Sequence, residues 1–147
     1  MAINTQRVVL GGLAGGVVMN VLDFITNNYL LRSMNDANLA RLNISAQSVM
    51  TGGNIALLVV LDLIAGILLT WLYAAIRPRF GAGGKTAVYA GLVGWLLAGW
   101  AWTYTFALGI FPWSAYAPSS IAALVTVLAG TYTGAWLYRE DGGVSTA

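Results

Sequence analysis

Residues 8–31 read VVLGGLAGGVVMNVLDFITNNYLL, a long apolar stretch whose one charged residue is Asp23. A helix needs about 20 mostly apolar residues to cross a bilayer core of about 30 Å, so this stretch predicts a membrane-spanning helix. Three similar stretches follow at about residues 55–76, 87–111 and 120–138. The pattern predicts an all-α membrane protein with four transmembrane helices, forming a single domain over residues 1–147.

The composition agrees with a protein that lies mostly in lipid. Hydrophobic residues make up 59% of the chain and charged residues 8%, whereas soluble domains have about 25% charged residues. The chain has no cysteine and no histidine, which excludes disulfides, thiolate chemistry and histidine-ligated haem. No hydrolase, zinc-protease or nucleotide-binding motif is present. We therefore predict a protein that is not an enzyme, with no catalytic residue, resident metal or cofactor.

The basic residues predict the orientation. Two of the seven, Arg32 and Arg41, lie between the first and second stretches. The other five lie before the first stretch, between the second and third, or after the fourth: Arg7, Arg77, Arg79, Lys85 and Arg139. Because cytoplasmic loops carry the excess of Lys and Arg, both termini are expected in the cytoplasm. These basic residues stand at helix ends rather than in a patch, so the predicted partner is the lipid bilayer and not a nucleic acid.

The segment 32–53 is too long for a simple turn. Apolar residues recur in it at helical spacing, with polar residues between them. This pattern predicts a short amphipathic helix on the outer membrane face, with Asn35 or Asp36 as its N-cap. The alternative interpretation is an ordered lid over the transmembrane helices.

The chain contains a weak internal repeat. Residues 6–15 read QRVVLGGLAG and residues 85–94 read KTAVYAGLVG, and Trp-Leu-Tyr occurs at both 71–73 and 136–138. The first two stretches therefore look like the last two. Because a two-helix repeat preserves orientation, we expect two similar helical hairpins related by an axis along the membrane normal.

Glycines recur at the spacing typical of closely packed membrane helices. Small residues at every fourth position let two backbones approach, which provides the van der Waals contact that holds helices together in lipid. The packing positions predicted in this way are Gly11, Gly12, Gly15, Gly16, Gly94, Gly130 and Gly134. Their partner could be another helix of the same chain or a second protomer.

Polar residues form a predicted layer inside the membrane. Asp23 and Asp62 are expected at a similar depth below the outer ends of the first two helices. The full set is Asn20, Asp23, Asn27, Asp62, Thr103, Tyr104 and Thr126. Ionisable groups in a membrane normally face a cavity or a partner. The layer could bind a proton or a hard cation, line a small-solute pocket open to the outer face, or act as a structural hydrogen-bond knot.

One observation favours the structural interpretation over a transport path. In the repeat, Asp23 aligns with Trp102 and Asp62 aligns with Val127, so the second half carries no matching charges.

The chain resembles small, uncharacterised four-helix proteins of the bacterial inner membrane. The resemblance rests on Arg7 before a Gly-rich helix, on the Asp23/Asn27 segment and on Arg77-Pro78-Arg79 after the second helix. It covers the whole chain but implies no site residues, because such proteins share no agreed chemistry. The leading hypothesis is an accessory or scaffold subunit, or a homo-oligomer, in which glycine faces are the contacts. The alternative is a small transporter or ion-binding protein that uses the Asp23/Asp62 layer.

Overall fold

The structure is a computed structural model that describes residues 3–139, and its regular elements are all helical. Four long helices are joined by shorter helical segments. In chain order the elements are α1 (Thr5–Ile25), a π-helix (Thr26–Leu30), α2 (Arg32–Arg41), α3 (Ala46–Val49), α4 (Gly52–Phe80), α5 (Gly84–Ala107), a 3₁₀ turn (Trp113–Ala115) and α6 (Tyr116–Leu137). The prediction of an all-α chain is thus confirmed.

Three of the long segments have the length and apolar composition of membrane spans. They are Thr5–Leu30, Gly52–Phe80 and Trp113–Leu137. The chain is therefore a membrane protein by the character of these helices. Helix α5 is also long, but it is not one of these three segments.

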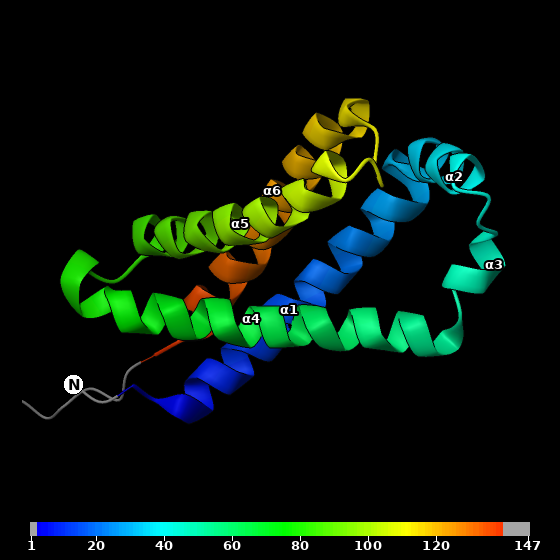
Figure 1. The fold of residues 1–147 in the computed structure, drawn as a ribbon. Helices are drawn as coiled ribbons and strands as arrows, with labels where there is room; N and C mark the ends of the chain where they lie inside the picture. The colour runs from blue at the N-terminus through cyan, green and yellow to red at the C-terminus, as the bar shows by residue number, and fades with distance from the viewer. Residues whose placement is uncertain (1–2, 140–147) are drawn as a thin grey trace, which may run out of the picture.

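The long helices converge at one end of the molecule and diverge at the other (Figure 1). The closed end holds Asn4, the turn Gly81–Gly83 between α4 and α5, and Tyr138. The open end holds α2, α3 and the loop Leu108–Pro112. Helix α1 packs mainly on α4 and α6, and α5 packs on α6 and α4. Helices α1 and α5 therefore occupy opposite corners, with α4 and α6 between them.

The hydrophobic core lies at the closed end. Its buried members come from all four long helices and from the chain just after α6: Val8, Tyr73, Ala74, Ala87, Ala90, Ala135 and Tyr138. Several of them are alanines, so the helices approach closely there. In contrast, every residue of Thr51–Leu61, at the start of α4, is exposed. The first part of α4 therefore projects away from the packed core.

Two glycine faces bring α1 against its neighbours. A Cβ atom built on Gly11 would lie 2.7 Å from the carbonyl oxygen of Gly134, and one on Gly15 would collide with the Gly130 carbonyl. Both neighbours belong to α6. A side chain of any size here would push the two helices apart.

The other glycine face of α1 meets α4. A Cβ on Gly16 would lie 2.6 Å from Leu63 Cα, and one on Gly12 would collide with Ile67. On α5, a Cβ on Gly94 would collide with the Leu69 side chain. The glycines singled out in the sequence thus have partners within the chain, which answers the question that the sequence left open.

Two tyrosines fasten the closed end. Tyr73 lies in the last third of α4. Its hydroxyl accepts a hydrogen bond from the Gly83 N–H, just before α5, at 3.1 Å. The Tyr138 hydroxyl, directly after α6, accepts from the Asn4 N–H just before α1, at 3.3 Å. The two buried rings pack edge to face with their centroids 6.1 Å apart. Each tyrosine joins the end of one long helix to the start of another.

The helix bounds differ from the predicted ones for reasons of backbone geometry. Helix α1 begins at Thr5 because the Asn4 side chain caps it by accepting from the Arg7 N–H. Helix α4 continues through Pro78 and stops at Gly81, whose φ of 85° does not fit a helix. Helix α5 ends at Ala107, short of the predicted residue 111, because Gly109 has a φ of 73°. Pro118 is accommodated in the first turn of α6, where no N–H donor is needed.

The outer segment is helical, but not as one capped helix. Helix α2 begins at Arg32, so the prediction that Asn35 or Asp36 is its N-cap was wrong. The chain continues almost directly from the π-helix into α2, and this continuity removes the need for a polar cap. The segment breaks at Asn43, whose φ is 54°, and Ser45 then caps α3 by accepting from the Ser48 N–H.

Candidate functional site

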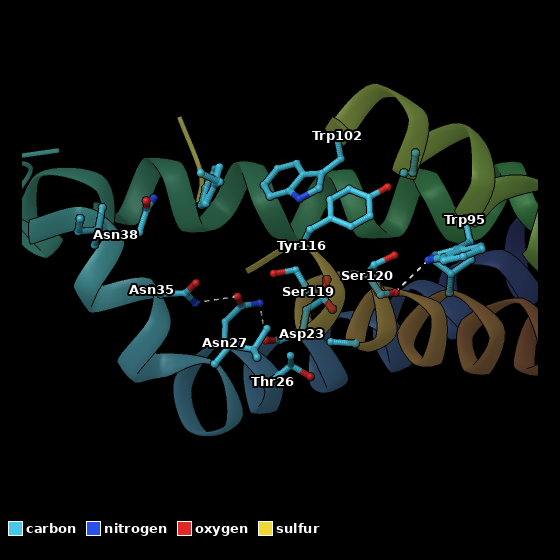
Figure 2. Close-up of a pocket in the computed structure, with 18 of the residues that line it drawn as sticks. Asp23, Thr26, Asn27, Asn35, Asn38, Trp95, Trp102, Tyr116, Ser119 and Ser120 are labelled. Atoms are coloured by element: carbon cyan, nitrogen blue, oxygen red, sulfur yellow. Dashed lines mark hydrogen bonds between the residues drawn. The ribbon is translucent and has the colours of Figure 1, made fainter. Parts of the chain in front are cut away.

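A cavity of about 490 Å³ opens between the helices at the open end. It lies between α1 and the π-helix on one side and α5 and α6 on the other, with α2 and α3 contributing to its rim (Figure 2). Its polar lining includes Asp23, Thr26, Asn27, Asn35, Asn38, Tyr116, Ser119 and Ser120. Its apolar and aromatic lining includes Leu31, Leu39, Val49, Met50, Trp95, Trp102, Phe111, Ala122, Ala123 and Val127. We call it the open-end cavity.

The polar side of the cavity is built where α1 changes to a π-helix. In this π-helix the Leu31 N–H bonds to the Thr26 carbonyl oxygen at 2.8 Å, one residue further back than in an α-helix. Such π-helical turns are rare, and they are frequent at functional sites. Asp23, Thr26 and Asn27 line the cavity at this point.

Two amide side chains connect this polar side to α2. The Asn27 side-chain amide donates to the Asp23 backbone carbonyl at 2.9 Å, and the Asn35 amide donates to Asn27 Oδ1 at 3.2 Å. Figure 2 shows this chain of hydrogen bonds from α2 to α1. The Asn27 amide is thus held by backbone and side-chain partners, and its N–H is directed to the Asp23 carbonyl rather than to the carboxyl.

Helix α2 forms a lid that is fastened to the far side of the open end. The Arg41 guanidinium donates to Asn38 Oδ1 at 2.9 Å and to the Gly109 carbonyl at 3.2 Å, and it also donates to the Ile110 carbonyl. Asn38 is buried and lines the cavity. Arg41 therefore links α2 to the loop that follows α5.

Aromatic side chains form the opposite wall. Trp95 Nε1 donates to the Ser120 carbonyl at 3.0 Å, which ties α5 to α6 at the cavity. The Tyr116 hydroxyl is 3.1 Å from Thr103 Oγ1. The Trp102 ring packs on Phe111 with centroids 5.1 Å apart. Figure 2 shows Trp102 and Tyr116 across the cavity from Asp23, Thr26 and Asn27. The site thus has a carboxyl on one side and aromatic rings on the other.

Asp23 is half-buried, and no Lys or Arg among the described residues forms an ion pair with it. Among residues 3–139 the one salt bridge joins Arg32 and Asp36, both exposed, at 3.7 Å. The buried Thr126 hydroxyl lies near the Asp23 carboxyl but forms no hydrogen bond with it. Asp62 on α4 is close enough for its charge to interact with that of Asp23. The site therefore contains a carboxyl, that of Asp23, with a second carboxyl, that of Asp62, in its neighbourhood.

The predicted polar layer is assembled in part. Asp23 and Asn27 line the cavity, whereas Asp62 and Thr126 lie near Asp23 but do not line it. Asn20 instead donates to the Gly16 and Val59 carbonyls and so joins α1 to α4.

Two predicted members of the layer lie away from it. Thr103 bonds to the Gly99 carbonyl and to Tyr116, and it does not line the cavity. Tyr104 is exposed and packs against Trp100.

Several lining residues were missed from the sequence. Asn35 and Asn38 were assigned to the outer helical segment without a role at a site, yet both line the cavity. Trp95 and Trp102 stand seven residues apart on α5, a spacing that puts both on one face of a helix and could have indicated a shared site. Tyr116 and Ser119 lay between the last two predicted helices, and Ser120 was the first residue of the last one.

The donor set does not form a preorganised metal centre. Within the described part of the chain, no three acidic, histidine or cysteine residues lie close enough together to hold a metal ion. Comparison of the chain with protein-family models, with curated proteins and with solved structures returns no match.

Proposed function

We propose that this chain is a four-span membrane protein that binds a small organic molecule in the open-end cavity. The observation that carries the proposal is the cavity itself. Its volume of about 490 Å³ lies in the range of about 300–1,000 Å³ typical of small-molecule sites. A mostly apolar and aromatic lining with a few converging polar groups is also typical of such sites. The protein acts by binding and not by catalysis.

This proposal changes the order of the two functional hypotheses. The scaffold hypothesis depended on glycine faces that await a partner. Those faces on α1 are occupied by α4 and α6 of the same chain. The small-solute hypothesis gains a cavity that contains two members of the predicted polar layer, Asp23 and Asn27. Binding of a solute is therefore the better-supported function.

The fourth proposed span is α5. Its 24 residues extend about 36 Å at about 1.5 Å per residue, enough for a bilayer core of about 30 Å. Between Lys85 and Arg139 the sequence has no charged residue. The helix also packs between α4 and α6, which are both long and apolar enough to span. Its tryptophans and tyrosines are tolerated in membranes, particularly near the interfaces.

The proposed duplication is supported by matching environments in the two halves. Four buried positions of α4, Gly66, Leu69, Thr70 and Tyr73, recur at the same spacing in the last helix as Thr131, Gly134, Ala135 and Tyr138, which are also buried. Tyr73 and Tyr138 accept hydrogen bonds from Gly83 and Asn4, which are equivalent positions before α5 and α1. Their rings meet each other, as equivalent residues near a two-fold axis do.

The proposed location is a bacterial cytoplasmic membrane, with the closed end in the cytoplasm. The support is the resemblance noted in the sequence and the distribution of basic residues, five toward the closed end and two toward the open end. Single cysteines at the exposed positions Ile44, Ala82 and Ser114 test the orientation. A membrane-impermeant maleimide added to intact cells should label I44C and S114C and leave A82C unlabelled. Labelling of A82C alone would show the opposite orientation, with the closed end outside the cell.

Binding is tested by filling the cavity from its own wall. Gly99 lines the cavity, and a Cβ built on it meets nothing within 4 Å, so Gly99→Phe can occupy the space without forcing α5 to move. Gly53 has equally open surroundings but lies on α4 outside the cavity, so Gly53→Phe is the matched control. Each variant is placed in lipid nanodiscs and titrated with 4-phenylbutylamine, 4-phenylbutanol and 4-phenylbutyrate while tryptophan emission is recorded.

The expected result is saturable binding of at least one probe to the wild type and to Gly53→Phe, with loss of binding in Gly99→Phe. Partition of the probe into lipid would give the same signal in all three proteins. A signal that does not saturate, or that Gly99→Phe leaves unchanged, contradicts the proposed function.

A second candidate function is association with a further copy of the chain or with a larger membrane complex. It is favoured by the first part of α4, where Ile55–Leu61 is exposed and apolar. Oxidative crosslinking of Leu58→Cys in native membranes tests it, with Leu96→Cys on α5 as a control of similar exposure. A dimer band for position 58 alone would support this candidate.

A further inference from the structure

We propose that the ligand of the open-end cavity is a monovalent organic cation, an ammonium group attached to a compact apolar body. This inference rests on the proposed function and adds the charge and chemical class of the ligand. It is carried by the arrangement of the cavity: a carboxyl without a basic partner on one side and aromatic rings on the other.

A carboxyl inside a membrane protein is costly unless something compensates its charge. Ionisable residues within spans normally pair with another charge or face a cavity. Asp23 faces the cavity, and no Lys or Arg of the described residues forms an ion pair with it. The two basic residues at the open end are engaged elsewhere, Arg32 with Asp36 and Arg41 with Asn38 and two backbone carbonyls. A positive group in the cavity would supply the missing partner.

The neighbouring polar groups leave the carboxyl available to a ligand. The Asn27 amide, the nearest strong donor along the helix, is bonded to the Asp23 backbone carbonyl instead. The Asn27 oxygen is in turn occupied by Asn35. A second carboxyl, that of Asp62, lies within electrostatic range of Asp23 but does not line the cavity. A cation in the cavity would stabilise the ionised form of this pair of carboxyls.

The wall opposite Asp23 suits an organic cation rather than a hydrated inorganic one. Trp102 and Trp95 line it, and indole rings attract ammonium groups through the negative face of the ring. In the proposed duplication, Trp102 occupies the position equivalent to Asp23. The cavity therefore has a carboxyl at this position in the first half of the chain and an indole at the equivalent position in the second half. Hard metal ions prefer several converging oxygen ligands, whereas most of this lining is apolar.

The three probes of the previous section separate the two proposals because they share one apolar body and differ in charge. In the wild type we expect 4-phenylbutylamine to bind at least about tenfold more tightly than 4-phenylbutanol, and 4-phenylbutyrate to bind most weakly, because a desolvated charge pair is strong. Asp23→Asn should lower the affinity for the amine about tenfold or more and bring it close to that of the alcohol.

Two further variants act as a control and as an independent test. Asp36→Asn removes the same charge from the exposed surface of α2 and should leave all three affinities unchanged. Trp102→Leu keeps an apolar surface but removes the ring. It should lower the affinity for the amine by a factor about threefold to tenfold larger than the factor for the alcohol.

The outcomes distinguish the two proposals. If the alcohol binds as tightly as the amine, or if the butyrate binds best, the cationic ligand is excluded while the binding function stands. Unchanged amine affinity in Asp23→Asn also excludes it. If none of the probes binds, both proposals fail. Should Asp23→Asn not fold, the probe series on the wild type and the Trp102→Leu variant still give the answer.

Discussion

The closed end and the open end of this molecule differ in how closely their helices pack. At the closed end, glycines and alanines let backbones come together, and the buried residues of all four long helices meet. At the open end, large side chains and a polar cavity stand where the helices diverge, and the first part of α4 is exposed throughout. The same four helices are thus a compact core at one end and a lined cavity at the other.

The difference teaches where stability and function reside. In lipid no hydrophobic effect draws helices together, so close backbone contact has to do so. That contact is concentrated where Gly11 and Gly15 meet α6 and where Gly12 and Gly16 meet α4. The closed end can therefore hold the fold while the open end keeps a cavity between the helices.

The largest effect is expected from Gly15→Leu, in the middle of α1 where this helix crosses α6. A Cβ at this position already collides with the Gly130 backbone carbonyl, which cannot move aside as a flexible side chain could. We expect a loss of about 3 kcal/mol of stability or failure to fold, the upper range for overpacking. The measurement is the melting temperature of the purified protein in detergent.

Gly53→Leu is the matched control for this variant. A Cβ on Gly53 meets nothing within 4 Å, so the same substitution should leave the melting temperature almost unchanged. Equal melting of Gly15→Leu and the wild type would show that α1 does not depend on contact with α6.

An intermediate effect is expected from removing the tyrosine hydroxyls. Tyr73→Phe and Tyr138→Phe each delete one acceptor at the closed end and leave the edge-to-face ring contact in place. Each should cost about 0.5–1.5 kcal/mol, the usual net value of a hydrogen bond. Because the two bonds occupy equivalent positions in the proposed repeat, their costs should be similar. A large cost for one and none for the other would count against the equivalence of the two halves.

The smallest effect on stability is expected from Arg41→Gln. This variant should have a larger effect on the access of solutes to the open-end cavity. This substitution removes the charge that holds α2 against the loop at Gly109 and Ile110. The melting temperature should fall by only a few degrees, because Arg41 is exposed and water can replace part of the interaction. Quenching of tryptophan emission by acrylamide should increase, since Trp95 and Trp102 line the cavity under the lid.

Arg32→Gln provides the comparison for the lid. Arg32 also lies on α2, but its one ion pair, with Asp36, is exposed and does not reach α5. Its quenching should match that of the wild type. If both variants are quenched equally, Arg41 does not fasten the lid.

Sequence reasoning was most successful where a local pattern has a local cause. The apolar stretches predicted an all-helical chain, and the glycine spacing of α1 identified residues that do lie at helix crossings. It was least successful at the open end. There the N-cap of α2 was wrong, and Tyr104 was assigned to a polar layer from which its exposed side chain is remote. Depth along a helix can be counted from the sequence, but the direction of a side chain around the helix depends on its neighbours.

By itself the sequence determined that the chain is helical, that it is apolar enough for membrane spans, and which small residues allow close contact. These properties follow from composition and from periodicity along one helix. Only the tertiary structure decided that the glycines of α1 meet α4 and α6 of the same chain, and that α2 closes over a cavity lined by Asp23 and Trp102. The physical reason is that both features depend on how far the helices diverge from the closed end. That divergence is set by contacts between residues far apart in the chain. Such contacts cannot be predicted from a local sequence pattern.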